Sequence, residues 1–278
     1  MRLLFEDLAK RRLTPERIQK LKDWVENADK ARTGGQLERR ANQYDKAEEL
    51  ITFYTFAPLE LREDKNDLLH EILAMARVHQ SVEGDTRMKF EKLYAPPKEY
   101  LSWFSNKVSN HPVRYMREQA KEHIKDNKDL ETETHVDAVI DEGNVVIFIE
   151  TKFTSDISVQ TTFNPNRNQL ARLIDVGIGV AKKGNKKLVV LVCSPKEFFD
   201  RKSRLFYYKV RDYSDYHEIK NDIEWRPQED IEKYLLKVAW VPLEEVIRIL
   251  YTGFSHSDKA EALAFFEERK LLKPDILF

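Results

Sequence analysis

Several features that mark whole classes of protein are missing from this chain. Cys193 is the one cysteine among 278 residues, so there is no disulfide framework, and we expect a reducing, cytoplasmic setting. The seven histidines show no close pairing, which argues against a structural zinc site. No apolar run has the length of a membrane span, and Glu6 and Asp7 interrupt the apolar N-terminus, which argues against a signal peptide. We therefore expect no membrane partner.

A net charge of one sign is also missing. The 47 lysines and arginines almost balance the 48 aspartates and glutamates, giving a formal net charge of −1 at pH 7. Proteins that coat nucleic acid without specificity need an overall positive potential, so this class is disfavoured. Any contact with phosphates has to come from local basic patches.

The middle of the chain is the most informative part. Residues 134–153 read T-H-V-D-A-V-I-D-E-G-N-V-V-I-F-I-E-T-K-F, which is typical of two β-branched, apolar strands joined by a turn at 141–144. Side chains alternate between faces along a strand, so Glu150 and Lys152 share a face. The run V-V-I-F-I before them is typical of a central strand buried on both faces.

The length of the turn decides whether Asp137 joins that face. A two- or four-residue loop centred on Glu142-Gly143 would place Phe148 opposite Asp137, and Asp137 would then lie diagonally beside Glu150, on the same face. A three-residue loop would turn Asp137 to the opposite face. We expect the first arrangement.

Ionised groups at the end of such a strand are costly unless they are paired, hydrogen-bonded or bound to metal. One interpretation is a Lys–Glu pair at a solvated strand end. The other is a hard-cation site, in which Asp137 and Glu150 supply the oxygen ligands that Mg²⁺ prefers. Lys152 would then orient or deprotonate an attacking water and stabilise charge that develops on a phosphate.

Asp137 followed by Glu150-Thr151-Lys152 resembles the D…(D/E)-x-K signature of the PD-(D/E)XK nuclease superfamily. Val136 stands where proline is usual, and E-T-E-T-H-V-D-A-V-I resembles a branch in which threonine and histidine precede the metal-binding aspartate. The resemblance spans about residues 112–195. It implies a restriction-endonuclease-like α/β core, a mixed sheet flanked by helices, and Mg²⁺-dependent hydrolysis of DNA, with Mn²⁺ able to substitute. It also adds the Thr151 carbonyl as a possible metal ligand.

Two predicted helices flank this hairpin. On the helix at residues 166–183, the resemblance implies that Gln169 points into the active site, and Arg167 or Arg172 could hold a phosphate. Ordinary surface polarity is the alternative for all three. On the helix at 112–124, the resemblance implies one further acid that faces the metal, and the sequence does not choose between Glu118 and Glu122.

The rest of the chain is read from periodicity. Residues 1–110 are predicted to be a helical region, with helices near 14–25, 36–54, 67–80 and 100–108, and residues 111–278 the nuclease domain. Strands are predicted at 187–194, 205–210 and 238–241, and helices at 243–251 and 257–270. The strand–helix–strand passage from 145 to 194 should be a right-handed crossover between parallel strands. The bases at 10–12 and 39–40 either contact DNA or lie on a solvated helical face. The bases and aromatic residues at 201–211 either contact nucleic acid or belong to an edge strand whose apolar side packs on the core.

The sequence therefore predicts a Mg²⁺-dependent DNA endonuclease, restriction-type or defence-related. Cutting both strands of a duplex commonly takes two active sites, so a homodimer is an open possibility. Two alternatives stay open: a catalytically inactive protein that binds nucleic acid or another protein on the same fold, and an RNase or structure-specific resolvase. Substrate choice resides in surfaces outside the core, so the fold does not decide between them.

Overall fold

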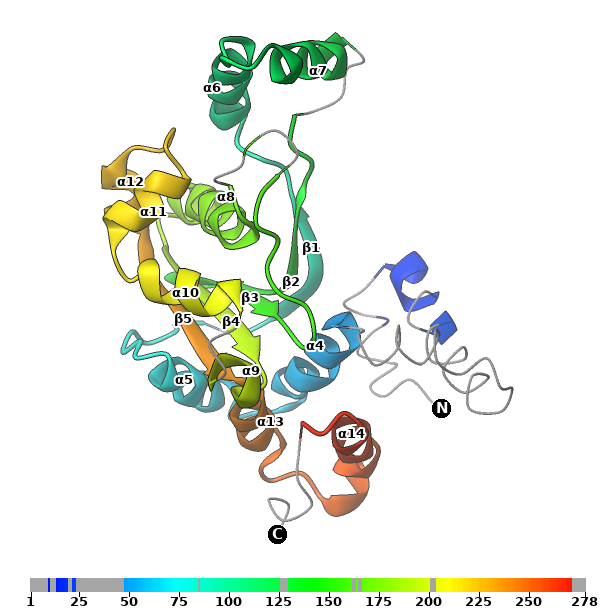
Figure 1. Ribbon diagram of the computed structural model, residues 1–278. Coiled ribbons are helices and arrows are strands. Elements are labelled where there is room, and N and C mark those ends of the chain that lie inside the picture. Colours follow the sequence, from blue (N-terminus) through cyan, green and yellow to red (C-terminus); the bar gives the residue numbers. More distant parts are fainter. Residues whose placement is uncertain are drawn as a thin grey trace, which may run out of the picture.

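The computed structural model describes residues 10, 14–19, 22–23, 48–84, 86–125, 130–161, 164, 167–200 and 204–271. They contain a five-stranded sheet with helices on both faces (Figure 1). The predicted α/β class, with a mixed sheet flanked by helices, is confirmed. Within these ranges, no helix combines the length and the apolar composition needed to cross a membrane.

The strands lie in the sheet in the order in which they occur in the chain, from β1 to β5. β1 (Met88–Tyr94), β2 (Thr134–Glu142) and β3 (Val145–Thr151) pair antiparallel, whereas β4 (Lys187–Ser194) and β5 (Leu235–Pro242) run parallel to β3. Parallel neighbours need a long connection, and both connections here contain helices. The predicted parallel pairing of 145–151 with 187–194 is confirmed.

Every residue of β3 is buried, as expected for a central strand covered on both faces. Its side chains alternate between two apolar clusters: Ile147 and Ile149 belong to one, and Val146 and Phe148 belong to the other. Leu191 on β4 faces the same side as Ile147. The two faces of the sheet thus form two separate cores.

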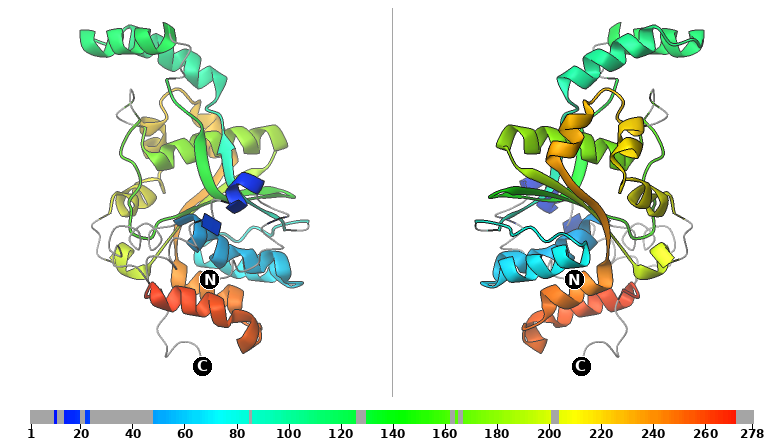
Figure 2. Two further views of the ribbon diagram at one scale, coloured as in Figure 1. Left: turned by 90° about the vertical axis from the view of Figure 1, so that its right-hand side faces the viewer. Right: turned by 90° about the vertical axis from the view of Figure 1, so that its left-hand side faces the viewer.

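The core that contains Phe148 is covered by four helices (Figure 2): α8 (Gln169–Gly184), α10 (Leu205–Asp212), α11 (Tyr216–Asp222) and α12 (Gln228–Tyr234). α8 begins where the Asn168 side chain accepts a hydrogen bond from the Ala171 amide. It packs closely on the sheet because Gly177 has no side chain: a Cβ there would lie 2.7 Å from the nearest atom of Leu188.

The opposite face is covered by α4 (Glu48–Phe56), the 3₁₀ turn η1 (Ala57–Leu61), α5 (Lys65–Met75) and α13 (Leu243–Tyr251). α14 (His256–Glu268) packs on α4 and α13, on the side away from the sheet. The short α9 (Lys196–Asp200) follows β4. α6 (Lys98–Ser109) and α7 (Arg114–Lys125), between β1 and β2 in the chain, project beyond one end of the sheet (Figure 1). They share a small apolar cluster of their own around Tyr100 and Phe104.

The predicted hairpin forms, and its register can be stated. Glu142 pairs with Val145, so Gly143 and Asn144 make a two-residue turn. Gly143 has φ +51°, and a Cβ there would lie 2.1 Å from the Glu83 carbonyl oxygen, so the position requires glycine. The predicted pairing of Phe148 with Asp137 is wrong by two residues, because Phe148 pairs with Val139. An even shift keeps Asp137 on the expected face.

Two predicted elements are wrong. The region 1–110 is not wholly helical, because Met88–Tyr94 is the edge strand β1 and belongs to the same sheet as the strands after residue 130. The division of the chain at residue 110 stays a prediction, although the sheet draws strands from both sides of it. The segment 205–210 is helix α10, and its buried Phe206 and Val210 are four residues apart, which is helical spacing.

Most of the other predicted elements agree with the structure. Residues 15–19 are helical after Thr14, whose Oγ1 accepts a hydrogen bond from the Arg17 amide. Helix α5 ends at Met75 rather than near residue 80. The pattern also places α6, α7, β5, α13 and α14 where the structure has them. Arg11, Arg12, Arg39, Arg40, Arg201, Lys202 and most of the predicted helix at 36–54 lie outside the described residues.

Candidate metal centre

The candidate site lies on a row of residues that crosses β1, β2 and β3 close to the C-terminal end of β3. The β2–β3 pairing ends at Ala138 opposite Ile149, and one further step places Asp137 opposite Glu150. On the other side, Phe90 pairs with Ala138 and Lys92 with Val136, which places Glu91 opposite Asp137. Three acidic residues on three adjacent strands therefore form a row across the sheet.

Asp137 and Glu150 are both buried, and their surroundings hold them differently. The Thr151 amide donates a hydrogen bond to Asp137 Oδ2 at 2.7 Å, in place of a continued strand ladder. Glu150 Oε1 receives the Lys152 ammonium at 2.8 Å and the Gln169 amide at 2.5 Å. Glu150 Oε2 is buried and has no hydrogen-bond partner among the described residues. That oxygen, like Asp137 Oδ1, is a ligand atom not committed to a close donor.

Lys152 lies at the centre of the acids. Its Nζ contacts Glu150 and also Glu48 Oε2, at 3.3 Å, and its side chain is 7% exposed. Burial alone would lower the pKa of Lys152, but the charges of Glu150, Glu48 and Asp137 outweigh it and raise the pKa above its ordinary value. Lys152 is therefore an ammonium ion at neutral pH.

Glu48 comes from the first turn of α4, 104 residues before Lys152 in the chain. Besides Lys152, its carboxylate accepts from the Phe153 amide at 2.9 Å and from Ser155 Oγ at 2.7 Å. Glu48 is therefore a helix acid that contacts the site, whereas Glu118 and Glu122 are not placed there. Those two residues lie on the projecting helix α7, where they contact Lys121 and Gln119.

Gln169 contacts Glu150, and its predicted role in an active site stays a prediction. It is the first residue of α8, and its two amide atoms connect Glu150 to the loop after β3: Nε2 donates to Glu150, and Oε1 accepts from the Ser158 amide at 3.3 Å. The Gln169 backbone amide donates in turn to the Ser158 carbonyl at 2.9 Å. Gln169 thus fixes the orientation of the Glu150 carboxylate.

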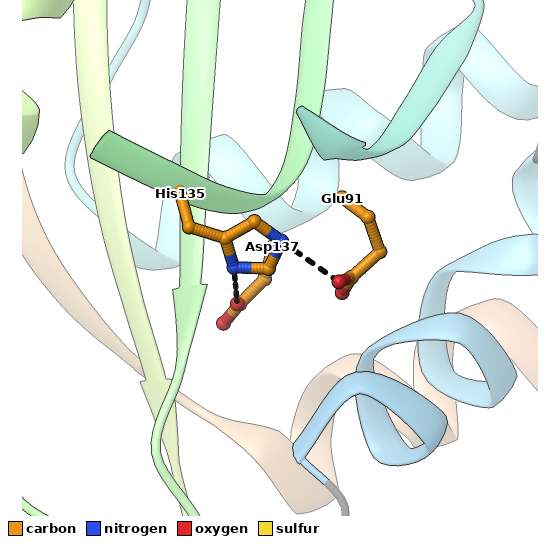
Figure 3. Close-up of side chains that lie close together, drawn as sticks. All are labelled: Glu91, His135 and Asp137. Carbon is orange, nitrogen blue, oxygen red and sulfur yellow. Dashed lines mark ion pairs between the residues drawn. The ribbon is translucent and has the colours of Figure 1, made fainter. Parts of the chain in front are cut away.

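Beside Asp137 lies a second group of ligand-type side chains (Figure 3). His135 precedes Asp137 by two residues on β2; its Nε2 lies 2.8 Å from Glu91 Oε2, and its Nδ1 lies 3.8 Å from Asp137 Oδ1. One ligand atom from each of the three residues lies within 4.8 Å of the others, so Glu91, His135 and Asp137 could hold a metal ion. Asp137 is a ligand predicted from the sequence, whereas Glu91 is not.

The electrostatics of the row are those of crowded, buried acids. Burial raises the pKa of Asp137 well above its usual value, and the charge of Glu150 adds to this, while Lys152 and the Thr151 amide oppose it. Burial likewise raises the pKa of Glu150, against the effect of Lys152. Without a cation the two carboxylates are therefore destabilised in their ionised forms, and a divalent ion between them would relieve both effects.

Arg167, predicted to hold a phosphate, is not placed to do so. Its side chain is 0% exposed, and its guanidinium pairs with Glu131 at 2.6 Å and with Asp175 at 2.9 Å, above the ring of Tyr100. This is a buried network of charges, which argues against the predicted phosphate contact. The sequence alone does not predict that Arg167 pairs with these two acids, because they come close to it only in the folded chain.

Arg172 is partly exposed, and its Nη2 donates to the carbonyls of Thr132 and Glu133. A role in binding nucleic acid stays a prediction for this residue, as does the Thr151 carbonyl as a metal ligand.

No protein-family model, curated protein or solved structure matches the chain. The geometry and the chemistry of the site are therefore the basis for assigning a function.

Proposed function

We propose that this protein is a Mg²⁺-dependent endonuclease that hydrolyses DNA phosphodiester bonds, on a PD-(D/E)XK-type core. The observation that carries the proposal is the convergence of Asp137, Glu150 and Lys152 at one end of a hairpin, from positions that the chain separates by up to fifteen residues. Buried acids beside a buried ammonium are costly to keep, and such arrangements are typical of sites that do chemistry.

The donor set fits a hard divalent cation. Asp137 and Glu150 offer oxygen atoms alone, and Glu150 Oε2 is buried with no partner among the described residues. Mg²⁺ takes one or two carboxylates in this way and keeps several waters, which a phosphate can displace. When bound, the ion would polarise the phosphate and lower the pKa of a coordinated water.

Lys152 would act as a fixed positive charge. Its raised pKa supports an ammonium that donates to the attacking water or to a phosphate oxygen, and argues against a neutral amine that removes a proton. Glu48 and Glu150 hold this ammonium from two sides. Preorganised charge of this kind needs no rearrangement as negative charge develops on the phosphate.

Gln169 and Glu48 would act as positioning residues. Gln169 restricts rotation of the Glu150 carboxylate by donating to Oε1, and it leaves Glu150 Oε2 available to a metal ion. Glu48 binds both Lys152 and the amide of Phe153, so it fixes the chain directly after the strand that carries the site. A constellation held this way loses little entropy when the substrate binds.

The test is cleavage of supercoiled plasmid with Mg²⁺, with Mn²⁺ and with EDTA, by wild type, Lys152→Ala and Asp137→Asn. Lys186→Ala is the matched control, because Lys186 also pairs with a carboxylate of the hairpin, Asp141 at 2.8 Å, but near the turn. We expect metal-dependent nicking by wild type and Lys186→Ala, and losses of about a hundredfold or more in the two site variants. Equal nicking by Lys152→Ala would contradict the assignment.

The same assay separates the alternatives. Duplex, single-stranded and branched DNA and a structured RNA are supplied as parallel substrates under each metal condition. Preference for RNA or for a branched junction would replace the DNA endonuclease by the RNase or the resolvase on the same scaffold. If nothing is cleaved while the protein binds nucleic acid with Mg²⁺ or without it, the binding protein is the better description.

A further inference from the structure

Glu91 and His135 are not needed by the proposed hydrolytic centre, yet they are directed at it from the edge strand and its neighbour (Figure 3). We propose that Glu91, His135 and Asp137 form a second divalent-cation site, selective for first-row transition metals over Mg²⁺. Binding of this ion does not depend on nuclease activity, so the inference goes beyond the proposed function. If both sites exist, Asp137 belongs to each of them.

The three side chains lie close together although Glu91 is distant in the chain from the other two. Glu91 comes from β1, while His135 and Asp137 lie two residues apart on one face of β2. One candidate ligand atom of each residue lies within 4.8 Å of the other two. Imidazole nitrogen and carboxylate oxygen bind such ions at roughly 2.0–2.2 Å, so modest side-chain rotation brings all three to one ion.

Glu91 also has a carboxylate oxygen with no hydrogen-bond partner among the described residues. The Glu91 side chain is 10% exposed, and its Oε1 is buried without a hydrogen-bond donor among the described residues. Its other oxygen is well held: Oε2 accepts from Arg17, which also lies 3.3 Å from Glu49, and from His135. A metal-binding carboxylate typically has this pattern, with one oxygen available to the ion and the other held by a donor outside the ligand set, here Arg17.

The backbone of Glu91 has an unusual conformation. Its φ is +53°, a left-handed conformation that side chains other than glycine rarely adopt, in the middle of strand β1. Its neighbours Phe90 and Lys92 keep their pairing with β2. The strand therefore departs from regular geometry at the residue that presents its carboxylate to His135 and Asp137, and such local strain concentrates at functional sites.

The donor set defines the class of ion. Mg²⁺ and Ca²⁺ bind through oxygen, whereas an imidazole nitrogen beside two carboxylates favours Mn²⁺, Fe²⁺, Co²⁺ or Zn²⁺. The charges also match, since two carboxylates and a neutral imidazole balance a divalent ion. Asp137 and Glu150 alone lack the nitrogen ligand. The two sites would thus differ in their preference for metal, although they share one residue.

The experiment measures Mn²⁺ binding to metal-free full-length protein by electron paramagnetic resonance of free Mn²⁺, in a large excess of Mg²⁺. We expect wild type to retain one Mn²⁺ that Mg²⁺ does not displace. Glu91→Gln and His135→Asn should each weaken this binding about tenfold or more, whereas Glu150→Gln should keep it. Circular dichroism confirms that each variant is folded, and His135→Asn does not depend on the unusual backbone of Glu91.

The inference is overturned if wild type retains no Mn²⁺ against Mg²⁺, or if folded Glu91→Gln and His135→Asn both retain it as wild type does. Its outcome is separable from that of the proposed function. A protein that retains Mn²⁺ through Glu91 and His135 but cleaves no nucleic acid would lose the nuclease and keep the metal site. A protein that cleaves with Mg²⁺ and shows no such Mn²⁺ would do the reverse.

Discussion

Lys152 Nζ lies 2.8 Å from Glu150 Oε1, and neither side chain is more than 7% exposed. Removing one partner of a buried pair leaves the other charge uncompensated, whereas removing both does not. Among the described residues, Glu48 is the other acid that contacts this ammonium. The same two side chains should therefore affect both the stability of the protein and its proposed catalytic activity.

Lys152→Met should lower the free energy of unfolding of the metal-free protein by about 3–5 kcal/mol, because it leaves Glu150 and Asp137 without their countercharge. Adding Glu150→Gln should recover part of that loss. Urea denaturation of wild type, both single variants and the double variant gives the coupling energy. Additive effects would mean that the two side chains do not interact as the structure places them.

Asp137→Asn should stabilise the metal-free protein at neutral pH by about 1–2 kcal/mol. The folded state raises the pKa of Asp137, so it binds the proton more tightly than the unfolded chain. The unfolding free energy of wild type therefore falls as pH rises from the unfolded pKa through the folded pKa. Asparagine does not titrate, so its contribution to the unfolding free energy does not change with pH. The advantage of the variant should therefore be small near pH 4 and full above the folded pKa.

Urea denaturation with EDTA, at about pH 4.5 and about pH 7.5, measures this difference. Asp141→Asn is the control, because Asp141 lies near the turn of the same hairpin, is partly exposed, and pairs with Lys186 and Lys89. It should give no stabilisation. An Asp137→Asn variant that is less stable than wild type at the higher pH would refute the argument from burial.

Gly177 and Gly179 should respond to alanine with opposite signs, although both lie in α8. A Cβ at Gly177 would lie 2.7 Å from Leu188 and 3.2 Å from Phe148, so Gly177→Ala should cost about 1–3 kcal/mol by overpacking. At Gly179 the nearest atom, on Arg226, is 4.0 Å away, so alanine should stabilise by up to about 1 kcal/mol through helix propensity. Thermal denaturation measures both, and equal effects would refute close packing at Gly177.

The sequence was sufficient for features that local periodicity determines. The alternation from Val145 to Lys152 predicts the shared face of Glu150 and Lys152, and Asp137 kept its face because the register error was an even number of residues. β1 was missed, although Met88 and Phe90 alternate with Lys89 and Glu91, because the run is short and highly charged. At 205–210 the aromatic residues favoured a strand, while the four-residue spacing of Phe206 and Val210 was the better signal.

The missed residues of the site depend on tertiary structure. Glu48 reaches Lys152 from α4 across 104 positions of the chain, and no local pattern distinguishes it from Glu49. Glu91 reaches His135 only because β1 pairs with β2 in one register. A single sequence carries the residue types of such a site but does not carry the long-range pairings that bring them together.

Arg167→Met should destabilise the protein by about 3–5 kcal/mol, because it leaves Glu131 and Asp175 buried with less countercharge. The effect should exceed that of Arg248→Ala, which removes an exposed pair with Glu245 and should cost no more than about 1 kcal/mol. Urea denaturation compares the two variants. If Arg167 instead served a phosphate, Arg167→Met would weaken nucleic-acid binding while leaving stability close to that of wild type, and that result would restore the role that its burial argues against.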